Sequence, residues 1–222
     1  MQKLSSPFDL IKKTVSIFAK KENLVFLIQI YLPVAFFSLI SVVQSFLPAS
    51  IRNSTSPGLV VGMGLVQILS LLTGVLVTIS GIIALGKVVD GGELSFKKTY
   101  KSAWKKYWTF LLLSIALTSI YLLGFIILIV PGLLFVVWFA FSRFIMIEKG
   151  VGIKESLLKS KGWAKGNYWK ILGRLLVFGV FTVVVQMVFS VIPYGVGSVA
   201  ASLCGGLFML PLYLLYKELD AR

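Results

Sequence analysis

The chain contains no histidine, a single cysteine and only 8 acidic residues among 222. Histidine is the usual general base and the commonest metal ligand in proteins, so its absence excludes most hydrolytic and zinc-dependent active sites. The one cysteine, Cys204, can form neither an intrachain disulfide nor a cysteine-cluster metal site. We therefore expect no catalytic residues, no metal site and no cofactor, and predict that the chain is not an enzyme.

Charged residues are also scarce, at 14% of the chain, where a soluble domain carries about 25%. Hydrophobic residues make up 58%, and the mean hydropathy is +0.95. A soluble fold of this size has too little polar surface to enclose so much apolar surface. The composition excludes a soluble enzyme and a disordered chain, and indicates a single integral membrane domain over residues 1–222.

Six apolar stretches predict an all-α membrane protein with six transmembrane helices. Five of them are long enough to cross about 30 Å of hydrocarbon as helices. The fourth is short and contains Arg143, so it spans only if that side chain reaches the headgroups. The stretches are residues 24–47, 59–85, 108–130, 133–147, 169–192 and 195–216.

The basic residues fall on one side of this six-span arrangement. The chain has 22 Lys and Arg and a net charge of +14, which in a soluble protein would suggest a nucleic-acid partner. In a membrane protein the same charge is first a topology signal. Of the 22 basic residues only Arg52 lies on the opposite side. We therefore predict a multi-pass protein of the cell membrane, with both termini and both long loops in the cytoplasm and no nucleic-acid partner.

The chain also indicates a threefold repeat, with units of about residues 5–86, 94–147 and 152–217. Each unit would contain a basic amphipathic segment, a long span, a turn with proline and a second span. The prolines of the three turns are Pro48, Pro131 and Pro193, at nearly equal distances from the preceding aromatic and lysine residues. Coincidence between similar hydrophobic sequences is the alternative.

The basic segments are predicted to be amphipathic helices on the inner membrane surface. Their apolar stripes are Phe8, Ile11, Val15 and Phe18, then Phe96, Tyr100, Ala103 and Tyr107, and a weaker stripe of Ile153, Leu157, Ser160 and Ala164. Lysines on the opposite face would meet anionic headgroups, either as a specific lipid site or as plain anchoring. The candidate lipid contacts of the second helix are Lys97, Lys98, Lys101 and Lys105.

Two arginines, Arg143 and Arg174, lie a few residues inside predicted spans and are further candidate contacts for anionic lipid. A guanidinium can bind a phosphate through two parallel hydrogen bonds. Snorkelling, or an ion pair with Glu148 or Glu155, is the alternative.

The spans also contain weakly polar features that permit more than one interpretation. Small residues recur on one face of the second span and one face of the sixth, which suits helix packing, dimerisation or a movable gate. Glutamines could join helices or line a polar path. These residues are Ser70, Gly74, Thr78 and Gly81, then Gly197, Ala201 and Gly205, and the glutamines Gln29, Gln44, Gln67 and Gln186.

Part of the chain resembles a known prokaryotic membrane family. The motifs are IVPGLL at residues 129–134, FSRF at 141–144, and IKESLLKSKG at 153–162 followed by NYWKI at 167–171. They resemble the membrane domain of glycerophosphoryl diester phosphodiesterases and related polytopic proteins. The resemblance covers about residues 87–180 and implies a six-helix membrane bundle with interfacial helices. It implies no activity, because the phosphodiesterase chemistry belongs to a separate catalytic domain.

Two functional hypotheses follow. The first is a non-enzymatic membrane scaffold, or the membrane part of an assembly, with anionic-lipid contacts and a protein partner or a second copy of the chain. The second is a small transporter or exporter of an amphiphile or lipid. A continuous polar cavity from the cytoplasm to the middle of the membrane favours transport, whereas a tightly packed bundle with an apolar exterior groove or an exposed small-residue face favours a scaffold.

Overall fold

The structure is a computed structural model that describes residues 4–48 and 56–221. These residues are almost entirely helical and contain no strand, as the apolar stretches predicted. The predicted outer-side residue Arg52 lies outside the described residues. The helices are α1 (Pro7–Phe18), α2 (Lys21–Ser45), α4 (Pro57–Asp90), α5 (Phe96–Lys105), α6 (Tyr107–Ile127), α7 (Ile129–Phe139), α8 (Ser142–Lys149), α9 (Ile153–Ala164), α10 (Tyr168–Ser190), the 3₁₀ turn η1 (Pro193–Gly195), α11 (Val196–Leu203) and α12 (Gly205–Asp220).

Six helical segments of the described chain are long and apolar enough to cross a membrane. They overlap the six predicted stretches, and the second, fourth and sixth are longer than predicted. Together they indicate a multi-pass integral membrane protein. The fourth has 21 residues and includes Arg143, so snorkelling of that arginine stays a prediction. The segments are Lys21–Gln44, Pro57–Asp90, Tyr107–Ile127, Ile129–Lys149, Tyr168–Ser190 and Val196–Asp220.

The fourth and sixth segments are interrupted, which the sequence did not indicate. The fourth divides into α7 and α8 at residues 140–141, and the sixth divides into α11 and α12 at Cys204. The predicted turn at Pro131 is also displaced, because Pro131 lies in the first turn of α7 and the connection is Leu128 alone. Proline is tolerated there because the first N–H groups of a helix have no partner within the helix.

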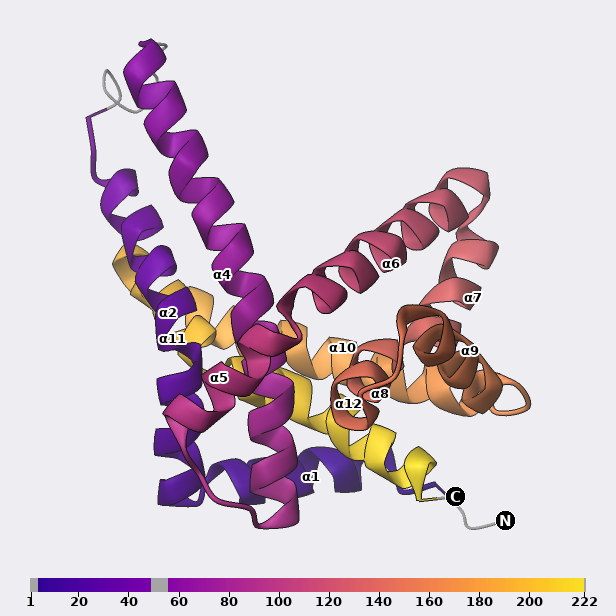
Figure 1. The fold of residues 1–222 in the computed structure, drawn as a ribbon. Coiled ribbons are helices and arrows are strands. Elements are labelled where there is room, and N and C mark those ends of the chain that lie inside the picture. Colours follow the sequence, from indigo (N-terminus) through magenta and orange to yellow (C-terminus); the bar gives the residue numbers. More distant parts are fainter. Residues whose placement is uncertain (1–3, 49–55, 222) are drawn as a thin grey trace.

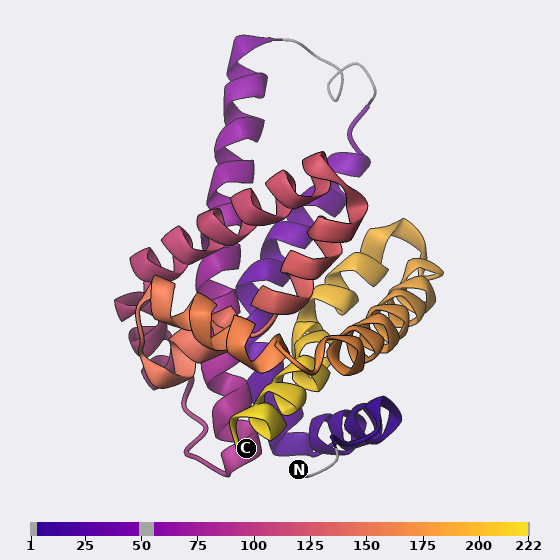
Figure 2. The same cartoon turned by 90° about the vertical axis from the view of Figure 1, so that its right-hand side faces the viewer.

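The helices form two hairpins that diverge from a common base (Figure 1). One contains α2 and α4, and the other contains α6 and α7. A third hairpin, α10 with α11, rises beside α2, and α4 extends beyond both (Figure 2). The core lies at the base, where buried residues of α4, α8 and α12 such as Leu85, Ile145 and Tyr213 meet. Much of the upper half of α4 is exposed and apolar, as a lipid-facing helix requires.

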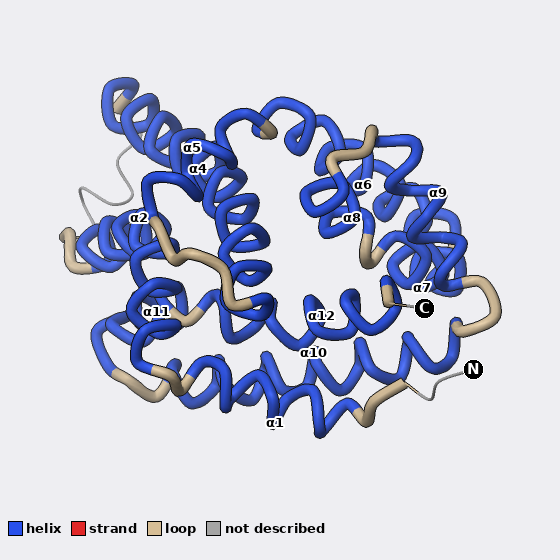
Figure 3. The backbone as a smooth tube through the Cα atoms, turned by 60° about the horizontal axis from the view of Figure 1, so that its bottom comes forward, coloured by secondary structure: helices blue, strands red, loops and turns tan. Residues whose placement is uncertain are grey.

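The three short basic helices pack onto the body of the protein. Helix α1 runs alongside α12 and α10 (Figure 3). Its predicted stripe is divided, since Phe18 is buried whereas Phe8 is 71% exposed and Val15 is 50% exposed. Contact of Phe8 and Val15 with lipid stays a prediction. The core-facing side of α1 contains Leu10 and Thr14 instead, because the neighbouring helices, and not the helical wheel alone, decide which face is covered.

The other two basic helices bury small residues. Helix α5 buries Thr99 and Ala103, and α9 buries Ser156, Ser160 and Ala164. The order of a short basic helix followed by a helical hairpin occurs three times along the chain. The equivalence of the three units as a repeat stays a prediction.

Candidate functional site

A cavity of about 630 Å³ lies between α2, α4, α10, α11 and the first turn of α12. The small-residue faces of α4 and α11, which lie far apart in the sequence, both contribute to its wall. Residues that define its chemistry are Tyr31, Gly74, Thr78, Gln186, Ser198 and Ser202. Part of each small-residue face therefore lines the cavity and does not pack directly against the other helix.

Tyr31 supplies the most unusual polar group of this wall. Its side chain is only 7% exposed, and its hydroxyl is buried without a hydrogen-bond partner among the described residues. Burying an unpaired hydroxyl costs about 1–3 kcal/mol. The residue lies about ten positions from the start of α2, or about 15 Å along the helix, close to halfway along the first span, Lys21–Gln44. An unpaired hydrogen-bond donor is therefore buried about halfway along that span.

Two glycines make room for this tyrosine. A Cβ built on Gly81 would lie 2.5 Å from the Tyr31 hydroxyl oxygen, and one built on Gly205 would lie 2.5 Å from the ring. Both distances are too short for any side chain. Glycine at these two positions on α4 and α12 therefore fixes where the hydroxyl sits.

The remaining hydroxyls of the wall donate within their own helices. Thr78 donates to the Gly74 carbonyl at 2.8 Å, and Ser202 donates to the Val199 carbonyl at 2.7 Å. Such a hydroxyl offers only lone pairs to a neighbour. Gln186, four residues from the end of α10, is exposed and makes no hydrogen bond to the described residues. No ionised side chain lines the cavity, so it suits an apolar molecule with one or two uncharged polar groups.

The lining of the cavity extends from about halfway along α2 toward the ends of the spans opposite the basic loops. Gln186 and the first turn of α11 lie at that far end, whereas Tyr31 lies halfway along its span. A cavity continuous with the basic side was the arrangement expected for transport. The cavity lining includes no residue of α8 or of the basic loops, and the base of the bundle is filled by the core of α4, α8 and α12.

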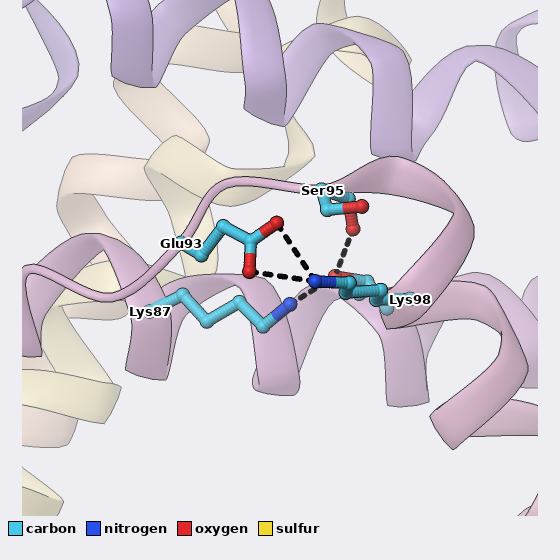
Figure 4. Close-up of polar contacts among 5 residues, drawn as sticks. Lys87, Glu93, Ser95 and Lys98 are labelled. Atoms are coloured by element: carbon cyan, nitrogen blue, oxygen red, sulfur yellow. Dashed lines mark hydrogen bonds and ion pairs between the residues drawn. The ribbon is translucent and has the colours of Figure 1, made fainter.

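The four predicted lipid-contacting lysines of α5, Lys97, Lys98, Lys101 and Lys105, are all exposed. Lys98 pairs with Glu93 at 2.7 Å (Figure 4), and both side chains are about two-thirds exposed, at 67% and 69%. The hydrogen bond from Lys98 lowers the pKa of Glu93. Lys98 is therefore already engaged, and the other three are better placed to meet an anionic surface. Their contact with lipid stays a prediction.

Two further hydrogen bonds attach α5 to the bundle. The Lys87 ammonium group at the end of α4 donates to the Thr99 hydroxyl at 3.0 Å (Figure 4). The Tyr100 hydroxyl donates to the Ile30 carbonyl of α2 at 2.7 Å, and burial raises the pKa of Tyr100 to about 12. These bonds hold α5 against α2 and α4 with its lysines outward.

The two arginines of the spans have different surroundings. Arg174 of α10 donates to the carbonyls of Leu4 and Ser5 at 3.0 and 2.7 Å, and to the carbonyl of Lys170 at 2.8 Å. It thereby binds the first described residues of the chain, next to the bond from the Ser5 N–H to the Glu218 carboxylate. Arg143 of α8 makes no hydrogen bond or ion pair with the described residues, and its Nε is buried.

Glu148, the expected partner of Arg143, is engaged elsewhere. Its carboxylate lies 3.5 Å from the Lys217 ammonium group, which also binds Asp90 at 2.8 Å. A third ion pair joins Lys149 to Asp220. These pairs connect the ends of α4, α8 and α12, so the tertiary structure assigns the acids at the base to lysines. Glu155 forms no ion pair within the described residues.

The sequence did not indicate Tyr31, nor the group formed by Lys217 with Asp90 and Glu148, the Lys217 cluster. The only signal for Tyr31 was a hydroxyl-bearing aromatic residue in the middle of an apolar stretch. Comparisons with protein-family models, with curated proteins and with solved structures find no match for this chain. The resemblance to the phosphodiesterase membrane domain therefore stays a prediction.

Proposed function

We propose that this protein is a non-enzymatic membrane protein that binds an uncharged amphiphile in the cavity, as a small transporter or exporter of lipid-like molecules would. The observation that carries the proposal is the buried, unpaired hydroxyl of Tyr31, a residue that lines the cavity about halfway along the first span. A buried donor without an acceptor is costly, and an acceptor on a bound molecule would remove that cost.

The wall supports one class of molecule over others. Tyr31 and the Gln186 amide can donate, and the hydroxyls of Thr78 and Ser202 can accept. An ester or ether oxygen near the middle of a lipid could accept a hydrogen bond from the Tyr31 hydroxyl. The acyl chains of the lipid would fill the apolar part of the cavity. A charged headgroup would find no counter-ion in this wall.

The orientation we infer is the one indicated by the lysines, with both termini and the basic loops in the cytoplasm of the cell. The ion pairs that join Asp90, Glu148 and Asp220 to lysines support this proposal, because they gather at one end the helix termini assigned to that side. The threefold repeat belongs to the same proposal, with one basic helix and one hairpin in each unit.

A cavity-filling substitution tests the proposal. A side chain added at Gly74 meets no atom within 4 Å, so Gly74→Leu should extend into the cavity without disturbing the fold. Gly64→Leu is the matched control, since Gly64 lies on the same helix, has equally open surroundings and does not line the cavity.

The measurement is photolabelling in phosphatidylcholine nanodiscs with a photoactivatable diacylglycerol analogue. We expect labelled peptides from the cavity wall in the wild type and in Gly64→Leu, and at least a fivefold loss in Gly74→Leu. Tyr31→Phe should also reduce labelling about fivefold, as expected for one hydrogen bond worth about 1 kcal/mol. Equal labelling of all four proteins would contradict the cavity as a binding site.

A scaffold or homo-oligomer is the second candidate, and the exposed part of α4 favours it. Leu65, Ile68 and Leu69 are each more than half exposed, and Gly58 and Gly62 have no neighbouring atom within 4 Å of a built Cβ. Small residues four apart allow close helix contact in membranes. Cysteine crosslinking from position 65 in native membranes, with Cys204 replaced by Ser, tests this second candidate.

A further inference from the structure

Arg143 is the one arginine of the spans for which the protein supplies no acceptor. Its guanidinium makes no hydrogen bond or ion pair with the described residues, and its Nε is buried. The terminal nitrogens are not among the buried atoms, so the planar end of the side chain remains accessible. A guanidinium stays charged at every physiological pH, so it cannot relieve its burial by losing a proton.

Arg174 is an internal comparison for this arrangement. It also lies a few residues inside a span, yet its guanidinium reaches three backbone carbonyls. The protein therefore does build acceptors around a membrane-embedded arginine where that residue has a structural role. Around Arg143 it builds none, although α8 lies in a packed part of the fold with Phe144, Ile145 and Met146 buried.

A second donor without an acceptor lies on the helix that packs against α8. This donor is the Tyr121 hydroxyl of α6, which makes no hydrogen bond to the described residues. Glu148 is held by Lys217, and the Lys106 ammonium group donates to the Ile147 carbonyl of α8. A guanidinium and a hydroxyl that both lack an acceptor favour binding of an anion.

We propose that Arg143 and Tyr121 form a binding site for a phosphate group between α6 and α8. The fork of the guanidinium binds two phosphate oxygens, and the tyrosine hydroxyl donates to the same group or to its neighbour. The phosphate can belong to the headgroup of an anionic lipid or be free inorganic phosphate. The site does not involve the cavity and does not depend on the function proposed for it.

The test compares thermal unfolding of the full chain in a neutral detergent after three additions. These are phosphatidylglycerol, phosphatidylcholine and inorganic phosphate. We expect phosphatidylglycerol to raise the unfolding midpoint of the wild type by several degrees more than phosphatidylcholine does. Arg143→Gln should lose at least half of that difference, and Arg143→Lys should lose a similar part because an ammonium group has no planar fork. Lys97→Gln, which removes an exposed cation of α5, should retain most of it.

Two results would overturn the site. One is a full response to phosphatidylglycerol in Arg143→Gln, and the other is a wild-type response in Arg143→Lys, which would show that charge alone acts. A midpoint shift with inorganic phosphate alone, lost in Arg143→Gln, supports the site and identifies a free anion as its source. A shift only with phosphatidylglycerol identifies the lipid headgroup.

A control addresses folding of the arginine variants. In neutral detergent without additions, Arg143→Gln should unfold at the same midpoint as the wild type or above it, because it removes a charge that has no partner. If Arg143→Gln does not fold, Tyr121→Phe decides the matter. It should retain the neutral-detergent midpoint and bind fewer phosphatidylglycerol molecules in native mass spectrometry, and an unchanged lipid count would overturn the proposal.

Discussion

Gly81 of α4 lies directly against Tyr31 of α2, so that a Cβ at Gly81 would come within 2.5 Å of the tyrosine hydroxyl. Gly205 is equally close to the ring from the opposite part of the chain. Glycine at these two positions therefore makes room for one aromatic side chain, Tyr31, within the same molecule. This contact sets the position of the donor on which the proposed binding site depends.

Gly81→Ala should destabilise the protein by about 1–3 kcal/mol, because the added methyl group overpacks a filled region. Gly74→Ala should change the stability little, since its Cβ has open space. Chemical unfolding in detergent measures both. The double variant Gly81→Ala with Tyr31→Phe should recover part of the loss, because the hydroxyl is the atom nearest to the new methyl group. Equal stability of the wild type and Gly81→Ala would contradict this packing.

Lys217→Met should reduce the free energy of unfolding by about 1–2 kcal/mol, between the effects typical of exposed and buried ion pairs. The substitution leaves the carboxylates of Asp90 and Glu148 without their shared cation. Lys98→Met is the control, because its pair with Glu93 is about two-thirds exposed and should contribute less than 1 kcal/mol. Thermal unfolding at low and high salt distinguishes the two, and an equal loss in both variants would be evidence against a structural role for the Lys217 cluster.

Arg174→Gln should release the start of the chain, because the bonds to the carbonyls of Leu4 and Ser5 are lost. A charged hydrogen bond contributes about 1.5–3 kcal/mol. Hydrogen exchange should increase in residues 4–18 while α6 and α7 keep their protection. Arg174→Lys should give an intermediate result, since one ammonium group cannot serve all the carbonyls. Unchanged exchange in both variants would mean that the contacts of α1 with the neighbouring helices hold it without the Arg174 bonds.

Replacing Lys97, Lys98, Lys101 and Lys105 with Gln should weaken any preference for anionic lipid by up to about 4 kcal/mol at low salt. Quenching of tryptophan fluorescence by brominated phosphatidylglycerol or phosphatidylcholine measures that preference, because Trp104 and Trp108 are exposed next to these lysines. Lys98→Gln alone should have the smallest effect of the four single changes, since Lys98 is paired with Glu93. A preference for anionic lipid that does not change with salt would contradict a role of these lysines in lipid binding.

Tyr100 should make the protein sensitive to alkaline pH. Its pKa is raised from 10.0 to about 12 by burial, so the folded state holds the phenol proton more tightly than the unfolded state does. The resulting stabilisation is complete below about pH 10 and is lost as the pH rises through 12. Tyr100→Phe should cost about 1 kcal/mol at pH 8, through the bond to the Ile30 carbonyl, and should lose less stability than the wild type between pH 8 and 11. Parallel pH profiles would contradict this role.

The number and type of the membrane helices followed from the sequence, because the length of an apolar run is a local property that the bilayer thickness converts directly into a span. The exposure of the α5 lysines could also be predicted, since a short helix with one apolar stripe leaves its charges on the other side. The breaks at residues 140–141 and at Cys204 could not, because the residues there are apolar like their neighbours. Both interrupted segments pack against another helix, the fourth against α9 and the sixth against α2.

The sequence by itself determined the all-helical, multi-pass architecture and the strong asymmetry of its charge, since both depend on composition along single stretches. Only the tertiary structure decided which polar groups find partners. Arg143 and Arg174 each lie a few residues inside an apolar stretch of the sequence. In the structure the carbonyls of Leu4 and Ser5 bind Arg174, whereas Arg143 has no acceptor among the described residues. Tyr31 likewise differs from other tyrosines only because two distant glycines hold it beside the cavity. Such pairing depends on contacts between residues far apart in the chain, which local patterns do not specify.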